Sequence, residues 1–82
     1  MVKNKKVKRY VVALYEDGDI KSALWHKAGC WGAFVDVDEK SLPNIKFFST
    51  KQAAQRLCDE YNAECSGGIE KAVVEEYVFN VK

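Results

Sequence analysis

The chain has little of what catalytic, metal-binding and membrane proteins need. Its 82 residues contain one histidine and three cysteines, so a four-ligand structural zinc site would need every one of them. No glycine-rich segment stands before the expected helix, where a phosphate-binding loop would have to lie. The longest apolar run is far too short to span a bilayer. These absences lead us to expect a protein without a metal, a cofactor or a membrane segment.

Cysteine usage and the N-terminal residues bear on the compartment. Cys30, Cys58 and Cys65 are an odd number and make no even disulfide framework. The N-terminus is charged, and no apolar stretch of signal-peptide length follows it, so export is not expected. We therefore predict a cytoplasmic protein with reduced thiols. A length of 82 residues is typical of one domain, which we take as residues 1–82.

Charge is unevenly placed, although the net charge is only +1. Residues 1–15 contain five basic side chains and no acid, whereas residues 59–82 contain six acids and two lysines. We expect residues 1–6 to form a flexible basic arm, because chain ends are usually loose. Such an arm can attract phosphate or an acidic protein surface. The basic residues of this region are Lys3, Lys5, Lys6, Lys8 and Arg9.

The first expected element is a strand over residues 7–15, which are rich in β-branched and aromatic side chains. Asp17-Gly18 follows, and this dipeptide is a strong hairpin signal because both residues tolerate positive φ. A two-residue turn there would pair Val11 with Leu24. Alternate side chains of the two strands would then point to opposite faces of the sheet.

The second turn, within residues 26–31, decides which face becomes the core. A two-residue turn at Ala28-Gly29 needs positive φ at Ala28, which is unfavourable. A three-residue loop over residues 27–29 puts only Gly29 in the left-handed region and moves the third strand over by one residue. We prefer this second register, because it separates apolar from polar side chains more cleanly. Its apolar face comprises Tyr10, Val12, Leu14, Ala23, Trp25, Trp31, Ala33, Val35 and Val37, with Lys21 as the one charge.

A helix and a last strand complete the expected fold. Ser49 is the expected N-cap, Gln52 stands where it closes a capping box, and Ser66-Gly67-Gly68 should end the helix. An apolar stripe recurs along it at three- and four-residue steps: Ala54, Leu57, Cys58, Tyr61 and Cys65. We predict a last strand over residues 73–81 and expect it beside the first strand. Its two faces are similarly apolar, so the sequence does not show which face points to the helix. The order β-β-β-α-β predicts an α+β fold, an antiparallel sheet of three to four strands with one helix on the tryptophan face.

His26 and Cys30 are the residues that chemistry could use, since an imidazole and a thiol can form a base and a nucleophile. In the preferred register they are cross-strand neighbours. No third side chain that would orient the imidazole can be identified. We therefore expect that the protein is not an enzyme and has no catalytic residues.

The sheet face opposite the helix is the predicted interaction surface. It would leave an apolar patch with His26 and Arg9 at its edge, and such patches often mark interaction sites. The alternative is that another segment, such as the N-terminal arm or residues 39–44, covers the patch. The candidate partner-binding residues are Val11, Tyr15, Ile20, Leu24, His26 and Phe34.

The function that remains is a small non-catalytic protein-binding module. It would dock a sheet face or a sheet edge on a larger protein as a regulator or inhibitor, a character shared by small phage and mobile-element proteins. Self-association through the same surface would give a homodimer. The alternative is a nucleic-acid-binding domain that uses the open sheet face and the basic arm. Against it, Asp36 and Asp38 would repel phosphate from that face.

Overall fold

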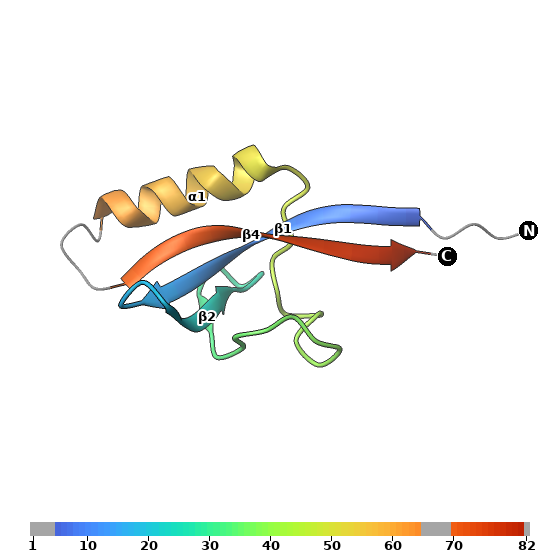
Figure 1. The fold of residues 1–82 in the computed structure, drawn as a ribbon, viewed down its shortest axis with the longest axis horizontal. Helices are drawn as coiled ribbons and strands as arrows, with labels where there is room; N and C mark the ends of the chain where they lie inside the picture. The colour runs from blue at the N-terminus through green and yellow to red at the C-terminus, as the bar shows by residue number, and fades with distance from the viewer. Residues whose placement is uncertain (1–4, 65–69, 82) are drawn as a thin grey trace, which may run out of the picture.

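The computed structural model describes residues 5–64 and 70–81, and it consists of one antiparallel sheet with a helix across one face (Figure 1). The elements are β1 (Lys5–Glu16), β2 (Ile20–Trp25), β3 (Trp31–Gly32), α1 (Lys51–Glu64) and β4 (Glu70–Val81). The strands lie in the order β3-β2-β1-β4. The predicted α+β class and the order β-β-β-α-β are confirmed, and the last strand lies beside the first.

β1 and β4 are much longer than the other strands, and they pair with each other from end to end. The molecule measures 54 × 25 × 24 Å, and Figure 1 shows the two strands continuing past the helix toward the chain ends. We call this projecting part, residues 5–9 with residues 77–81, the ribbon. Lys5 and Lys6 pair with residues of β4, so the expectation that they belong to a flexible arm is wrong. Lys3 lies outside the described residues.

The first hairpin turns where the sequence predicts, but with a longer loop. Asp17 and Gly18 have φ values of 51° and 81°, and the loop spans residues 17–19. The register also shifts at a bulge further along β2. As a result Leu24 pairs with Ala13, and the predicted pairing of Leu24 with Val11 is wrong.

The bulge moves one charge off the helix face. Beside the turn Lys21 pairs with Tyr15, and beyond the bulge Ala23 pairs with Leu14. Ser22 is the extra residue, and an extra residue reverses which face its neighbours point to. Lys21 therefore points away from α1, not toward it as predicted.

The second turn has the preferred three-residue form. Gly29 has a φ of 85°, and Trp25 pairs with Trp31. The two indole rings meet edge to face with their centroids 5.0 Å apart. β3 ends at Gly32, however, so the predicted extension of this strand over residues 33–37 is wrong. Instead Val37 packs on the opposite face of the sheet.

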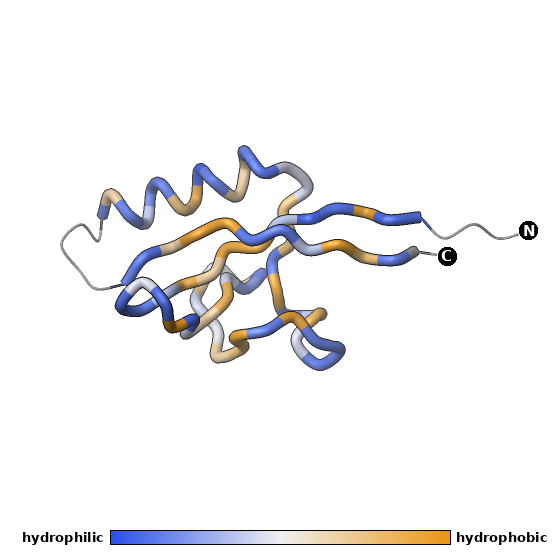
Figure 2. The backbone as a smooth tube through the Cα atoms, viewed as in Figure 1, coloured by the Kyte–Doolittle hydropathy of each residue, from blue (hydrophilic) through white to orange (hydrophobic). Residues whose placement is uncertain are grey.

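α1 packs on the tryptophan face through the predicted apolar stripe. Ala54 and Cys58 are fully buried against Val12 and Ala72. Figure 2 shows the helix hydrophilic on its outer side and more hydrophobic toward the sheet. Cys65 and the expected helix stop at residues 66–68 lie outside the described residues. No helix in the described ranges has the length and apolar character that crossing a membrane requires.

The helix begins one residue later than predicted, and its cap is Thr50 instead of Ser49. The Thr50 hydroxyl accepts a hydrogen bond from the N–H of Ala53 at 3.2 Å. A cap at Thr50 puts Ala53, which has no polar side chain, at the third helical position. Gln52 therefore cannot close a capping box.

We predict that Thr50→Ala lowers the free energy of unfolding by about 0.5–2 kcal/mol, because the N–H of Ala53 loses its acceptor. Ser49→Ala is the matched control and should change it by less than about 0.5 kcal/mol. Urea unfolding followed by circular dichroism measures both variants. A larger loss for Ser49→Ala would return the cap to Ser49.

Candidate functional site

The sheet face that the sequence predicts to be open is covered. Val11 and Leu24 are 2% and 0% exposed, and they share a core cluster with Ile45. Phe34 packs against the same cluster. The expectation of an exposed apolar patch is therefore wrong, because most of this face is core. Ile20, at the hairpin, is the candidate residue that stays exposed, at 59%.

The covering segment is the chain between β3 and α1. It includes residues 39–44, which the sequence suggests as one alternative cover for the patch. Ile45 forms a bridge with His26, and Phe48 forms another with Tyr10. The N–H of Phe48 donates to the carbonyl of Tyr10 at 2.8 Å, and the N–H of Tyr10 donates back at 2.9 Å. These backbone bonds fix the covering segment against both β2 and β1.

A closed turn stiffens the same cover. The Asp38 carboxylate accepts the N–H of Ser41 at 2.8 Å, and the Ser41 hydroxyl accepts the N–H of Asp38 at 2.8 Å. The hydrogen bonds from the backbone and side chain of Ser41 hold the pKa of Asp38 below its ordinary value. Ser41 itself is fully buried. The Asp38 carboxylate therefore has a structural role, because it stabilises this turn.

Tyr15, another candidate residue, belongs to a polar cluster that ties three strands together. Lys21 Nζ lies 2.8 Å from one oxygen of the Glu75 carboxylate, and the Tyr15 hydroxyl donates to the other oxygen. Burial acts to lower the pKa of Lys21, but the hydrogen bond and the charge of Glu75 outweigh it and raise that pKa. The same carboxylate, with some burial, raises the pKa of Tyr15. Glu75 is thus committed to a structural ion pair.

The contact between His26 and Cys30 is a hydrogen bond between their backbones. The N–H of His26 donates to the carbonyl of Cys30 at 2.9 Å. The imidazole stacks on Phe34, with the ring centroids 5.2 Å apart, and lies so close over Gly32 that a Cβ there would collide with it. Its Nε2 is buried and has no hydrogen-bond partner within the described chain. The imidazole is therefore packed as an aromatic ring, while the Cys30 side chain is exposed.

The remaining groups that could serve chemistry are dispersed. Cys58 is a free thiol, and burial raises its pKa to about 11. It is therefore almost entirely protonated at neutral pH and a poor nucleophile. Within residues 5–64 and 70–81, no three His, Cys, Asp or Glu side chains gather as they would around a cation.

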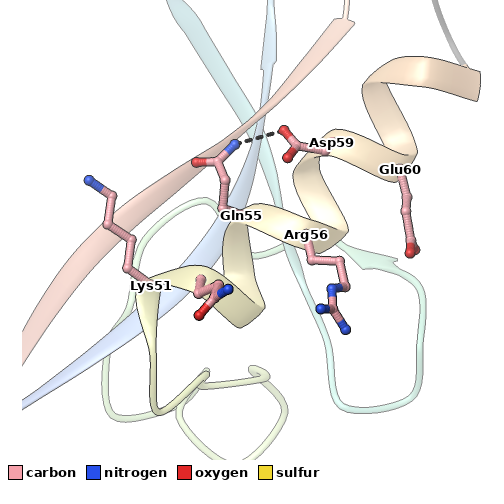
Figure 3. Close-up of a pocket in the computed structure, with 6 residues that line it drawn as sticks. Lys51, Gln55, Arg56, Asp59 and Glu60 are labelled. Carbon is pink, nitrogen blue, oxygen red and sulfur yellow. Dashed lines mark hydrogen bonds between the residues drawn. The ribbon is translucent and has the colours of Figure 1, made fainter.

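A shallow hollow on the outer surface of α1 is lined by polar side chains of that helix alone (Figure 3). Gln55 donates to the Asp59 carboxylate at 3.0 Å, while Arg56 and Glu60 point the other way. All the lining residues are exposed, and they carry both signs of charge. This hollow is a solvated helix surface without a buried group that would fix a ligand. The lining residues are Lys51, Gln52, Gln55, Arg56, Asp59 and Glu60.

The outer edge of β4 differs from these surfaces. Tyr10 directs both its N–H and its C=O to Phe48, away from β4. In an antiparallel ladder the residue opposite must then direct its own N–H and C=O outward. That residue is Glu76. Because the direction alternates along a strand, the even-numbered residues of β4 all present their backbone groups to the outer edge.

Asn62 of α1 closes one end of this edge. Its side-chain amide accepts the N–H of Ala72 at 3.0 Å and donates to the Ala72 carbonyl at 3.1 Å. These bonds agree with the outward direction of the even-numbered residues, since they replace those a neighbouring strand would make. Further along, the described residues offer no partner to the outward groups. We call residues 74–80 the open edge, and its outward residues are Val74, Glu76, Val78 and Asn80.

Aromatic and basic side chains flank the open edge on the ribbon. The rings of Phe47, Tyr77 and Phe79 form a cluster with centroids 4.7 to 6.0 Å apart. Lys8 pairs with Val78, so both lie on the face opposite these rings. Val78 is 40% exposed. The open edge therefore has apolar side chains on both faces, and lysine beside one of them.

Comparison with known proteins identifies no relative, because no family model, curated protein or solved structure matches the chain. The candidate site is therefore defined by geometry, as the open edge and the ribbon. The predicted site residues do not include β4. Its signal in the sequence is a run with neither proline nor lysine from Ala72 to Asn80, two residues with which proteins often protect an exposed edge.

We predict that Leu24→Asp unfolds the protein, because an unpaired carboxylate at this fully buried position costs several kcal/mol (about 3 or more). Ile20→Asp is the matched control on the same strand. It should stay folded and change stability by less than about 0.5 kcal/mol. Thermal unfolding followed by circular dichroism separates them. A folded Leu24→Asp variant of unchanged Tm would show that this face is open after all.

Proposed function

We propose that the protein is a non-catalytic protein-binding module, and that its partner adds an extended strand to the open edge. The row of outward backbone groups from Val74 to Asn80 is the observation that carries this proposal. In strand addition, main-chain hydrogen bonds supply affinity and neighbouring side chains supply specificity. Such a module works by occupying its partner, as a cytoplasmic regulator or inhibitor of the phage or mobile-element kind would do.

The side chains around the edge support strand addition. Proteins usually protect a long edge with lysine, proline, a bulge or a covering element. Among the described residues, Asn62 is the one side chain that closes the edge, and it does so at Ala72 alone, with Glu76 the one outward-facing residue of the open edge that is charged. An added strand would place alternate side chains beside Tyr77 and Phe79 on one face and beside Val78 on the other. Both faces would gain apolar contact from one partner strand.

Val78→Pro is the test that the backbone geometry allows. The N–H of Val78 points outward, so proline would remove a donor from the open edge and none from the ladder with β1. We expect the variant to have a normal circular dichroism spectrum. The amount of partner protein that it captures from the native host's lysate should fall about tenfold or more. Val78→Thr, which keeps the N–H, should capture the same protein as the wild type. A folded Val78→Pro variant that captures it equally well would move the interface away from the edge.

The ribbon favours a second candidate function, nucleic-acid binding. Four cations lie on its first strand, and neither ribbon strand contains a carboxylate. A two-stranded β-ribbon fits the major groove of DNA, and exposed parts of Tyr77 and Phe79 could stack on bases. The sheet face that the sequence predicts as a stacking surface is covered, so it does not support this function. The ribbon cations are Lys5, Lys6, Lys8 and Arg9.

Salt dependence tests this second candidate. If the ribbon contacts phosphates, affinity for a labelled DNA duplex should fall steeply as salt rises, with a slope of about −0.9 per phosphate contact. Joint replacement of Lys6 and Lys8 by Gln should reduce that slope by about 2. Lys51→Gln with Arg56→Gln, on the outer helix surface, is the control and should leave the slope unchanged. Absence of binding at low salt would reject nucleic-acid binding.

A further inference from the structure

We infer that the strand taken up by the open edge is β4 of a second copy, so that two four-stranded sheets join into one across a two-fold axis. The inference rests on the proposed function in one respect, that the open edge is a docking site. It goes further by naming the occupant. The backbone phase, the length of the edge and its charges support the same arrangement.

The backbone phase, Asn62 and the full length of the open edge together favour an axis at Tyr77. In a symmetric antiparallel pair, outward-facing residues must oppose outward-facing residues. With Tyr77 on the axis, Val78 opposes Glu76 of the second copy, so this condition holds. The paired segment then runs over residues 73–81. It begins directly after Ala72, which Asn62 closes, and it ends with the last residue of β4.

Charge makes the open edge complementary to itself. Glu76 lies toward one end of the edge, and Lys8 stands beside Val78 toward the other. The two-fold axis puts Glu76 of the second copy next to Val78, one strand further from Lys8. Strands are about 4.8 Å apart, so the two backbones lie about 10 Å from each other, within reach of a lysine and a glutamate side chain together. Two such ion pairs form, one on each side of the axis.

The register with Glu76 on the axis loses this complementarity. If Glu76 stood on the axis it would oppose its own copy, and like charges directly opposite are destabilising. With Tyr77 on the axis no two acids are opposite each other. The two Tyr77 side chains instead meet in a pair without mutual hydrogen bonds, where Cα atoms approach to about 4.5 Å. The exposed part of Val78 is also covered.

Charge exchange tests the interface. The wild-type protein should have twice the 9.3 kDa mass of the chain in sedimentation equilibrium. Glu76→Lys and Lys8→Glu should each weaken the dimer about tenfold or more, since each places like charges together. The two changes combined in one chain should restore it. Glu60→Lys on α1 is the control and should leave the dimer unchanged, with circular dichroism confirming that every variant is folded.

Cross-linking tests the register. In a background with Cys30→Ser and Cys65→Ser, Tyr77→Cys should form a disulfide between the two copies, because the opposed Cα atoms lie within disulfide range. Phe79→Cys should not, since its copy lies four residues away along the strand. A cross-link at residue 79 and none at residue 77 would overturn the proposed axis.

The outcomes separate this inference from the proposed function. A wild-type protein that stays monomeric at high concentration overturns the homodimer. If that monomer still captures a protein that Val78→Pro loses, the open edge binds a different partner and the proposed function stands. If it captures none, both fail. A dimer that survives Val78→Pro and both charge reversals uses another surface, and the inference is wrong.

Discussion

The pairing of β1 with β4 along twelve residues is the interaction on which the other contacts depend. It makes β1 a central strand that is buried on both faces. Val11 belongs to the core cluster under the covering chain, and Val12, its neighbour, belongs to the cluster under the helix. The two cores are therefore opposite sides of one strand. A slip of this pairing by one residue would exchange the faces and disrupt both clusters together.

The unequal lengths of the strands explain where the candidate site lies. β2 has half the length of β1 and parts from it after Leu24 pairs with Ala13. The covering chain takes over as the neighbour of β1, as the bridge between Phe48 and Tyr10 shows. Residues 5–9 extend beyond that bridge, and among the described residues they pair with β4 alone. The ribbon is thus the part of the β1–β4 pair that extends beyond β2 and the covering chain.

Local features could be predicted from the sequence, and long-range ones could not. Gly29, the tryptophan face and the helix stripe each depend on residues a few positions apart. The covering segment depends on contacts between distant residues, because Ile45 packs against Leu24 and Val11 only once the chain has folded back over the sheet. Residues 33–37 keep the alternation of a strand, and nothing local indicates that the His26 ring lies over Gly32. Two local features differ from the prediction by one residue: β2 has an extra residue at Ser22, and the helix cap is Thr50 instead of Ser49. Sequence signals for the ends of helices are seldom more exact than one or two residues.

The apolar character of both faces of β4, which prevented its orientation from sequence, has a structural reason. Val73 packs in the cluster under the covering chain, and Val74 packs in the cluster under the helix. The same alternation continues onto the ribbon with Tyr77 and Val78, where no helix covers the sheet (Figure 1). β4 therefore packs in two cores at one end and is apolar on both faces at its other end, where the described residues offer no partner to its outward backbone groups. Asn62 closes that edge only where the helix reaches it, so the open edge has a fixed beginning, as a surface for one partner strand of defined length requires.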